Sequence, residues 1–290
     1  MKEAFIKLHL SIFIAGFTGV FGKLITLPSI PLVGYRMVLS SIILFICLLC
    51  WKKLKPVSLR DALSIGGVGI LLCLHWIFFY ASIKASNISI GVVCFSLVCF
   101  FTALLEPSLT GRKFSWNELG ISLLTLLGIL LIFSFDTRYR TGITLGVISS
   151  LLAALFTIYN KRIGVHYPAS TALLYEMIGG ALLLTAIMPV YCSYFASWET
   201  VIPDWKNWIY ILLFVLFCTI ILYILQIQVL KKISAFTVNL NYNLEPIYSI
   251  IIAMLFFGEA KELHFPFYAG ISLIFISILL QMKRVLKEKK

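Results

Sequence analysis

Ten apolar runs of about 20 residues each, joined mostly by short polar connections, constrain the fold of this chain more than any other feature. A helix needs roughly 20 mainly apolar residues to cross the hydrocarbon core of a bilayer. The chain is 61% hydrophobic and 12% charged, whereas a soluble domain usually carries about 25% charged residues. A water-soluble fold could not bury this much apolar surface, so the sequence predicts an all-α membrane protein with ten transmembrane helices. The predicted spans are residues 5–25, 30–50, 62–83, 88–110, 116–135, 141–160, 169–190, 207–229, 234–257 and 265–282.

The lysine and arginine residues are distributed unevenly between the two sides of these spans. With connections that alternate between sides, 17 of the 24 basic residues lie on the side of both chain ends, six lie on the other side, and Arg36 lies inside a span. Basic loops are typical of the cytoplasmic side of a membrane. The sequence therefore predicts a multi-pass protein of the cell membrane with both termini in the cytoplasm. Its short loops and Lys-rich edges fit a bacterial inner membrane.

The net charge of +12 follows from this topology rather than from a nucleic-acid partner. A nucleic-acid-binding protein concentrates Lys and Arg on one face or stripe, whereas here they stand in short groups between apolar runs. We expect the lipid bilayer as a partner, with anionic headgroups beside the basic loops.

The single CxxC spacing, Cys47 and Cys50, has no His nearby, and no Walker, HExxH or GxSxG motif is present. We therefore expect the chain to bind no metal or cofactor and not to be an enzyme.

The chain also repeats itself weakly. "FIAGFTGVFGKLI" aligns with "LLAALFTIYNKRI" at an offset of 138 residues, and "GISLLTLLGILLI" aligns with "GISLIFISILLQM" at 150. Between these segments Lys84 matches Lys231 and Gly111 matches Gly258, both at an offset of 147. Each half holds five spans, an odd number, so the second half enters the membrane from the opposite side, as in many secondary transporters. The expected inverted five-helix repeats are residues 1–136 and 137–290.

Three segments of the chain are similar to a known group. They are "VGYRM", which contains Arg36, "YASIKASNISIGVV", and "NLEPIYSIIIAMLFFGEAKELHFPFYAGISLIF", which contains the Glu-Pro pair at Glu245 and the "FGE" ending at Glu259. With these segments the chain resembles the EamA family of the drug/metabolite transporter superfamily over essentially its whole length. In the first repeat, Arg112 stands where this family often has an acidic residue after Gly. The resemblance implies a ten-helix exporter or exchanger of small metabolites.

The stretch "NLNYNLEPIYSI" places Glu245 at the midpoint of the ninth predicted span. An ionisable residue there costs about 2.5–3.5 kcal/mol on insertion scales and usually faces a cavity or a partner. Pro246 removes a backbone donor and disfavours helix at the preceding residue, while Asn239 and Asn243 share one helix face. We interpret the stretch as a mid-membrane site for a substrate or a proton. The alternative is a protonated Glu245 that caps the backbone groups freed by Pro246.

Arg36 and Glu176 occupy equivalent positions in the two predicted repeats. "VGYRMVLSSIIL" aligns with "LLYEMIGGALLL" at an offset of 140, which also pairs Tyr35 with Tyr175. Since the repeats are inverted, the two charged residues lie on opposite sides of the midplane, with about 10 Å of depth between them. They could pair directly or line the two ends of one cavity. Arg36 is a candidate for binding a substrate carboxylate through its fork of donors, and a structural tie to a helix-end carbonyl is the alternative.

Other polar and aromatic residues in the spans allow both functional and structural interpretations. His75, Trp76 and Tyr80 of the third span could form the wall of a cavity or a helix-packing surface. Glu106 precedes another proline, but it lies near the end of its span and close to Arg112, so local charge pairing is expected. The glycines of "GFTGVFG" and "GGVG" lack the context of a phosphate loop, and in apolar runs such residues let helices approach closely.

These observations predict a secondary transporter, an exporter or exchanger, that moves small metabolites by alternating access, with amino acids as the leading substrate class. Proton coupling through Glu245 or Glu176 is a further hypothesis. Two other classes stay open: a flippase for a lipid-linked intermediate, which needs a cavity open sideways to lipid, and a non-transporting scaffold or sensor. A homodimer also stays open. The candidate substrate-binding residues are Glu245, Asn239, Asn243, Arg36, Glu176, Tyr35, Tyr175, His75, Trp76 and Tyr80.

Overall fold

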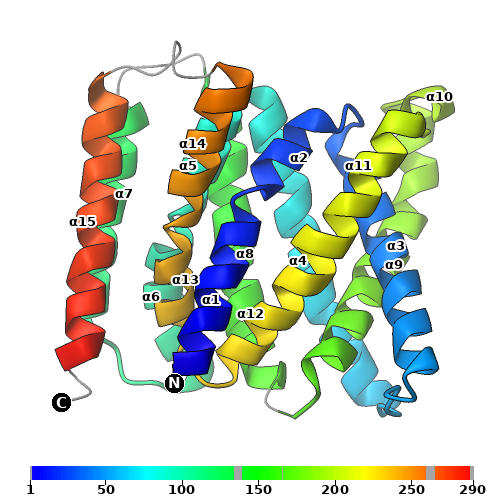
Figure 1. Ribbon diagram of the computed structural model, residues 1–290, viewed down its shortest axis with the longest axis horizontal. Helices are drawn as coiled ribbons and strands as arrows, with labels where there is room; N and C mark the ends of the chain where they lie inside the picture. The colour runs from blue at the N-terminus through cyan, green and yellow to red at the C-terminus, as the bar shows by residue number, and fades with distance from the viewer. Residues whose placement is uncertain (1, 134–138, 165, 259–264, 288–290) are drawn as a thin grey trace.

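The secondary structure in the computed structural model is helical, with no β-strand among the residues that it describes. Those residues are 2–133, 139–164, 166–258 and 265–287. The long helices run between two faces of the molecule, and α1 (Lys2–Ala15) begins at the same face at which α15 (Phe265–Lys287) ends (Figure 1). We call this the N-terminal face and the opposite one the distal face.

The predicted apolar runs coincide with helices or with interrupted helices. The continuous ones are α3 (Ser29–Cys50), α4 (Leu59–Ala85), α7 (Trp116–Phe133), α8 (Arg140–Gly164), α9 (Ala169–Tyr194) and α15, with the short α10 (Trp198–Val201) after α9. The interrupted ones are α1 with α2 (Thr18–Leu24), α5 (Ile88–Phe95) with α6 (Val98–Thr110), α11 (Trp205–Val215) with the π-helix η2 (Leu216–Ile221) and α12 (Leu222–Leu230), and α13 (Ala235–Tyr242) with α14 (Glu245–Phe257).

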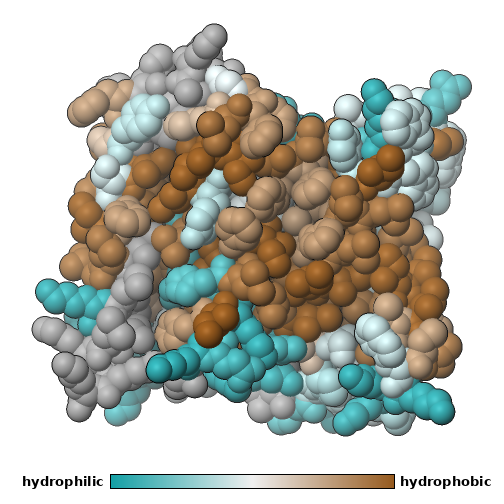
Figure 2. Space-filling view, in the orientation of Figure 1, coloured by the Kyte–Doolittle hydropathy of each residue, from teal (hydrophilic) through white to brown (hydrophobic). Residues whose placement is uncertain are grey.

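The length and composition of these helices suit a membrane. Among the described residues, eight helical stretches are long and apolar enough to cross a bilayer, and shorter apolar helices cover Trp116–Leu131 in α7 and Tyr268–Ser277 in α15. On the face shown in Figure 2, apolar side chains cover the middle, and hydrophilic side chains gather along the N-terminal edge. Large apolar residues such as Leu255 and Phe256 are exposed. This surface suits lipid tails rather than water, and the all-helical prediction is confirmed.

Two interrupted helices have the same internal plan, 147 residues apart. α5 and α13 each contain eight residues, α6 and α14 each contain 13, and two residues separate the members of each pair. Each pair begins at a polar N-cap, Asn87 or Ser234, whose side chain accepts a backbone hydrogen bond. Each ends at a left-handed glycine, Gly111 (φ 70°) or Gly258 (φ 68°), a conformation that disfavours residues with a Cβ atom. The two glycines that align in the sequence therefore have the same structural role.

Glycines allow two pairs of helices to pack at very short distance. Where α4 crosses α9, a Cβ atom on Gly179 would lie 2.3 Å from the Gly66 carbonyl oxygen, and one on Gly69 would lie 1.9 Å from the carbonyl oxygen of residue 176. The packing role predicted for "GGVG" is therefore confirmed. At one edge of the molecule α7 lies beside α15 (Figure 1), and a Cβ atom on Gly128 would lie 2.6 Å from the Gly270 carbonyl oxygen.

A cluster of charged residues joins α6, α7 and α13 at the N-terminal face. Arg112 lies 3.4 Å from Glu106 Oε2 and 2.5 Å from Glu118 Oε1. Glu106 Oε2 also accepts a hydrogen bond from the backbone N–H of Phe236, in the first turn of α13. The predicted pairing of Glu106 with Arg112 is confirmed, and Glu118 is a further partner that was not predicted from the sequence.

Candidate functional site

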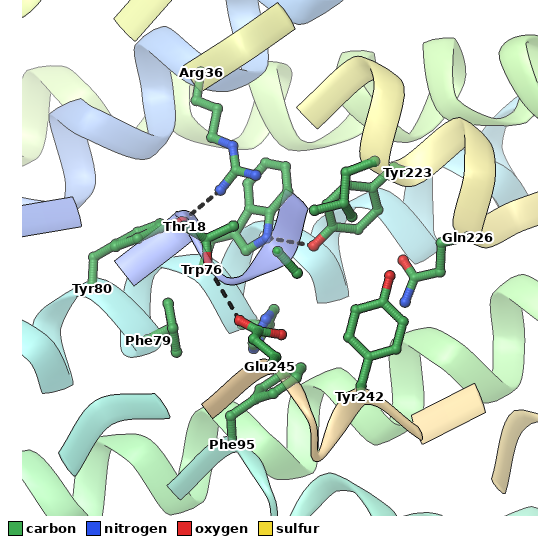
Figure 3. A pocket seen from close by; sticks show the side chains of 13 residues that line it. Thr18, Arg36, Trp76, Phe79, Tyr80, Phe95, Tyr223, Gln226, Tyr242 and Glu245 are labelled. Carbon is green, nitrogen blue, oxygen red and sulfur yellow. Dashed lines mark hydrogen bonds between the residues drawn. The ribbon is translucent and has the colours of Figure 1, made fainter. Parts of the chain in front are cut away.

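A buried cavity of about 40 Å³ lies where the interruptions of α1/α2 and α13/α14 meet α3, α4, α5 and α12 (Figure 3). This volume has room for about three water molecules. Five predicted site residues line the cavity: Arg36, His75, Trp76, Tyr80 and Glu245. The other lining residues are Ala15, Thr18, Phe79, Phe95, Leu222, Tyr223, Gln226 and Tyr242.

The guanidinium of Arg36 is fixed in this cavity by three hydrogen bonds. Nη1 donates to the Tyr80 hydroxyl at 2.7 Å, Nε to the Thr219 hydroxyl at 2.6 Å, and Nη2 to the Cys218 carbonyl at 2.6 Å. Its central carbon lies 3.4 Å from the centre of the Trp76 ring, within the range of a cation–π interaction. Arg36 is 1% exposed, and no carboxylate of the described residues forms an ion pair with it. Two of its five N–H donors therefore remain for a ligand.

The π-helix η2 provides two of the three acceptors for Arg36. A π-helix replaces the usual i→i+4 hydrogen bonds by i→i+5 bonds, and η2 turns the Cys218 carbonyl and the Thr219 hydroxyl toward the guanidinium. The Thr219 hydroxyl donates in turn to the Phe214 carbonyl at 3.3 Å, five residues earlier. The Phe214 ring lies 4.2 Å from the guanidinium carbon of Arg36. The bulge is thus the local structure that positions Arg36.

Glu245 reaches the cavity from the side opposite to Arg36 (Figure 3). It is the first residue of α14, and its Oε1 accepts a hydrogen bond at 3.2 Å from the hydroxyl of Thr18, which is the first residue of α2. Glu245 is 4% exposed. Because a helix interruption directly precedes both residues, the two interruptions place a carboxyl and a hydroxyl in the cavity. Within the described residues, the Glu245 side chain bonds to no backbone group, so the capping alternative gains no support.

Aromatic side chains form the wall between these two groups. Trp76 Nε1 donates to the Tyr223 hydroxyl at 2.8 Å, and the two residues are 147 positions apart. His75 is held against α8, since its Nδ1 lies 3.0 Å from the Ser149 carbonyl oxygen and 2.8 Å from the Ser149 hydroxyl. The two interpretations of these aromatic residues, cavity wall and helix packing, therefore apply together.

Asn239 and Asn243 lie on α13 and at its end, but their side chains face α6. Asn239 Nδ2 donates to the Thr102 hydroxyl at 2.8 Å, and Asn243 Nδ2 to Cys99 Sγ at 3.5 Å. Both asparagines are buried, and neither lines the cavity. The structure thus separates them from Glu245, although they share its sequence stretch.

Three more predicted residues lie outside the cavity. Glu176 is 1% exposed, and its Oε2 has no hydrogen-bond partner among the described residues. It forms no ion pair with Arg36 in this conformation. Tyr35 packs edge-on against Trp208, with 5.3 Å between ring centres, and borders a separate apolar groove of about 360 Å³ between α3 and α9. Tyr175 is half-buried and borders neither.

Four polar residues that line the cavity are not among those predicted from the sequence: Thr18, Tyr223, Gln226 and Tyr242. A signal existed for Tyr223, because it follows Trp76 at the offset of 147 that also relates Lys84 to Lys231. Gln226 lies one turn further along α12, and its Oε1 has no hydrogen-bond partner in the described part of the chain. Thr18 stands inside an apolar, Gly-rich run, where only the interruption of the helix makes it part of the cavity.

Known proteins share both the sequence pattern and the fold. The model of the EamA-like transporter family matches residues 4–134 and 140–282. Two uncharacterized transporters of Bacillus subtilis (strain 168) are similar: YxxF is 26% identical over 98% of this chain and 90% of its own length, and YetK is 24% identical over 99% and 88%. A solved structure described as "Crystal structure of protein" has the same fold, with a TM-score of 0.71 at 13% identity over 100% of both chains. The chain belongs to the EamA-like transporter family.

Proposed function

We propose that this membrane transporter carries amino acids, or metabolites with a similar pair of charged groups, by alternating access. The observation that carries the proposal is the position of Arg36 and Glu245 on opposite sides of one buried cavity (Figure 3). The two remaining N–H donors of Arg36 suit the carboxylate of an amino acid, and the carboxylate of Glu245 suits its ammonium group. The rings of Trp76 and its aromatic neighbours suit an apolar side chain.

The size of the cavity supports a transport cycle with a closed intermediate. The cavity has room for about three water molecules, which is too little for an amino acid with a side chain, so such a substrate enters only after the surrounding helices separate. Opening toward one face and then toward the other converts this cavity into a site with alternating access.

The topology that we propose contains ten spans in two inverted five-helix repeats, residues 1–136 and 137–290, with both termini in the cytoplasm. The equal lengths and interruptions of α5/α6 and α13/α14 support this arrangement. The hydrogen bond between Trp76 and Tyr223 gives further support, since it joins two equivalent residues. The uneven distribution of basic residues supports the orientation.

Glu245 is also our candidate for coupling transport to protons. Its carboxyl group is buried, and within the described residues it has a hydroxyl partner in Thr18 and no ion pair. Such a carboxyl group is costly to keep charged inside a membrane protein, so binding an ammonium group and binding a proton are two ways to neutralise it. Competition between the substrate ammonium group and a proton for Glu245 would couple substrate transport to proton transport.

Counterflow into preloaded liposomes tests both proposals. Purified protein is screened with amino acids, nucleosides and sugars, and then with an imposed pH gradient. We expect exchange of amino acids, loss of exchange in Arg36→Ala and Glu245→Gln, and no loss in the exposed control variants Arg60→Ala and Glu199→Gln. Amino acid exchange that survives both cavity substitutions contradicts the proposed site. Proton coupling is contradicted if wild-type exchange does not depend on the pH gradient and Glu245→Gln is still active. If no compound in the panel is exchanged, the lipid flippase is favoured.

A further inference from the structure

On the distal face, a lysine ties together two helices that line the cavity. Lys84 lies in the last turn of α4, and its Nζ donates to the carbonyl oxygen of Ile25, directly after α2, at 2.9 Å. The next residue, Thr26, exchanges two hydrogen bonds with the Asn207 side chain of α11, at 3.0 and 2.9 Å. The end of α2 is therefore held against both α4 and α11 at this face.

On the N-terminal face, a second lysine makes an equivalent bond. Lys231 directly follows α12, and its Nζ donates to the carbonyl oxygen of Tyr167, in the connection between α8 and α9. The Tyr167 hydroxyl donates to Asp61 Oδ2 at 2.6 Å, which joins this connection to the start of α4. Nearby, Lys161 Nζ donates to the Ile233 carbonyl oxygen at 3.0 Å, so the connection after α12 is also tied to α8.

The two lysines correspond in the internal repeat. They are 147 positions apart, as are the hydrogen-bonded Trp76 and Tyr223 in the cavity. Each lysine stands at the end of a helix that precedes an N-capped, interrupted helix, and each bonds to a carbonyl in the connection that follows the first span of its own half. The same bond is thus made twice, on opposite faces of the molecule.

The position of each bond indicates what its release would do. α2 carries Thr18 and α4 carries Trp76 and Tyr80, so separating α2 from α4 at their distal ends would open the cavity toward the distal face. α12 carries Tyr223 and Gln226, so separating its end from the α8–α9 connection would open the cavity toward the N-terminal face. Both bonds are present together in this structure, and the cavity measures only about 40 Å³.

We propose that Lys84 and Lys231 are a matched pair of latches, each of which keeps the cavity closed toward its own face, and that the transport cycle releases them alternately. This inference rests on the proposed alternating-access function. It assigns a role in the conformational cycle to two residues that touch neither Arg36 nor Glu245. The latches are positioning residues: they act through the helices that they hold together.

Access to a cysteine in the cavity, measured separately from each side of the membrane, tests the latches without a substrate. Ala15 lines the cavity, and Ala15→Cys is labelled with a membrane-impermeant maleimide in right-side-out and in inverted vesicles. Parallel samples without Ala15→Cys correct for the native cysteines. Lys84→Met and Lys231→Met each keep most of the side-chain length but remove the donor. Because a hydrogen bond from a charged group contributes enough to shift a population about tenfold, we expect Lys84→Met to raise the labelling rate from the distal side about tenfold. Lys231→Met should do the same from the N-terminal side.

Further variants separate latching from general loosening of the fold. Lys206→Met on the distal side and Lys55→Met on the N-terminal side remove the same charge from exposed residues and should leave both rates unchanged. In the double variant Lys84→Met/Lys231→Met, the ratio of the two labelling rates should return toward the wild-type ratio. Lys84→Arg and Lys231→Arg keep a donor and should have wild-type labelling rates. Equal increases from both sides in either single variant, or no change in either, would overturn the proposal. Because labelling needs no substrate, failure of the counterflow screen and failure of the latches are separate results.

Discussion

Replacing Arg36 with Lys tests the proposed binding role of the guanidinium without removing the positive charge. In the wild-type protein, three of its five N–H donors bond to Tyr80, Thr219 and the Cys218 carbonyl, so two remain for a carboxylate. A lysine ammonium has three donors in total and cannot serve these three acceptors and a ligand together. A hydrogen bond to a charged group contributes about 1.5–3 kcal/mol. Loss of one ligand bond therefore weakens carboxylate binding by about ten- to a hundredfold.

Calorimetry on purified protein measures this loss. The ligands are the amino acid that gives the strongest counterflow and its amide, in which the carboxylate is replaced by a neutral group. We expect wild type to prefer the acid, Arg36→Lys to lose most of this preference through weaker binding of the acid, and the exposed control Arg60→Lys to keep it. An Arg36→Lys protein that binds both ligands as wild type does would refute the reasoning.

Two further predictions concern the packing around the site. In Gly179→Ala the new Cβ atom would lie 2.3 Å from the Gly66 carbonyl oxygen, so α4 and α9 must separate, and we expect a loss of about 1–3 kcal/mol in unfolding free energy. Unfolding titrations in mixed micelles check this. The control is Gly67→Ala, whose new Cβ atom meets nothing within 4 Å, and which should lose no stability and gain up to about 1 kcal/mol from helix propensity. Tyr223→Phe leaves the buried Trp76 N–H without its partner and should cost about 1–3 kcal/mol in the same titrations. Trp76→Phe should lower the unfolding free energy less in the Tyr223→Phe variant than in wild type. If the two losses are strictly additive, the hydrogen bond between Trp76 and Tyr223 is weak.

The sequence predicted the helices well because the length and apolarity of a membrane-spanning helix follow directly from the thickness of the bilayer. Arg36 and Glu245, which line the cavity, were also candidates from the sequence, because a charged residue in an apolar run is conspicuous. The interruptions were harder to find. Pro246 marks the one between α13 and α14, but those at Gly16–Phe17 and Ser96–Leu97 contain no proline. The positions of these two interruptions are therefore set by tertiary packing.

The direction of a polar side chain on a buried helix depends on tertiary structure as well. Asn239 and Asn243 were predicted to share a face, and they do, since both bond to α6. Sequence spacing shows which residues lie on one face, but not whether that face meets a neighbouring helix or a cavity. Thr18 illustrates the converse, because nothing in its local sequence distinguishes it from a packing threonine until Glu245 is placed beside it.

The π-helix makes the site sensitive to chain length as well as to residue type. Each residue added to or removed from a helix turns everything after it by about 100°. Deleting one residue from η2 to restore a regular α-helix would rotate α12 relative to α11, and Tyr223 and Gln226 would leave the cavity. The same deletion would withdraw the Cys218 carbonyl from Arg36. The length of η2 thus sets the orientation of the cavity wall and the position of the Arg36 guanidinium together, so a chain with a regular helix at this position would line the cavity with other side chains.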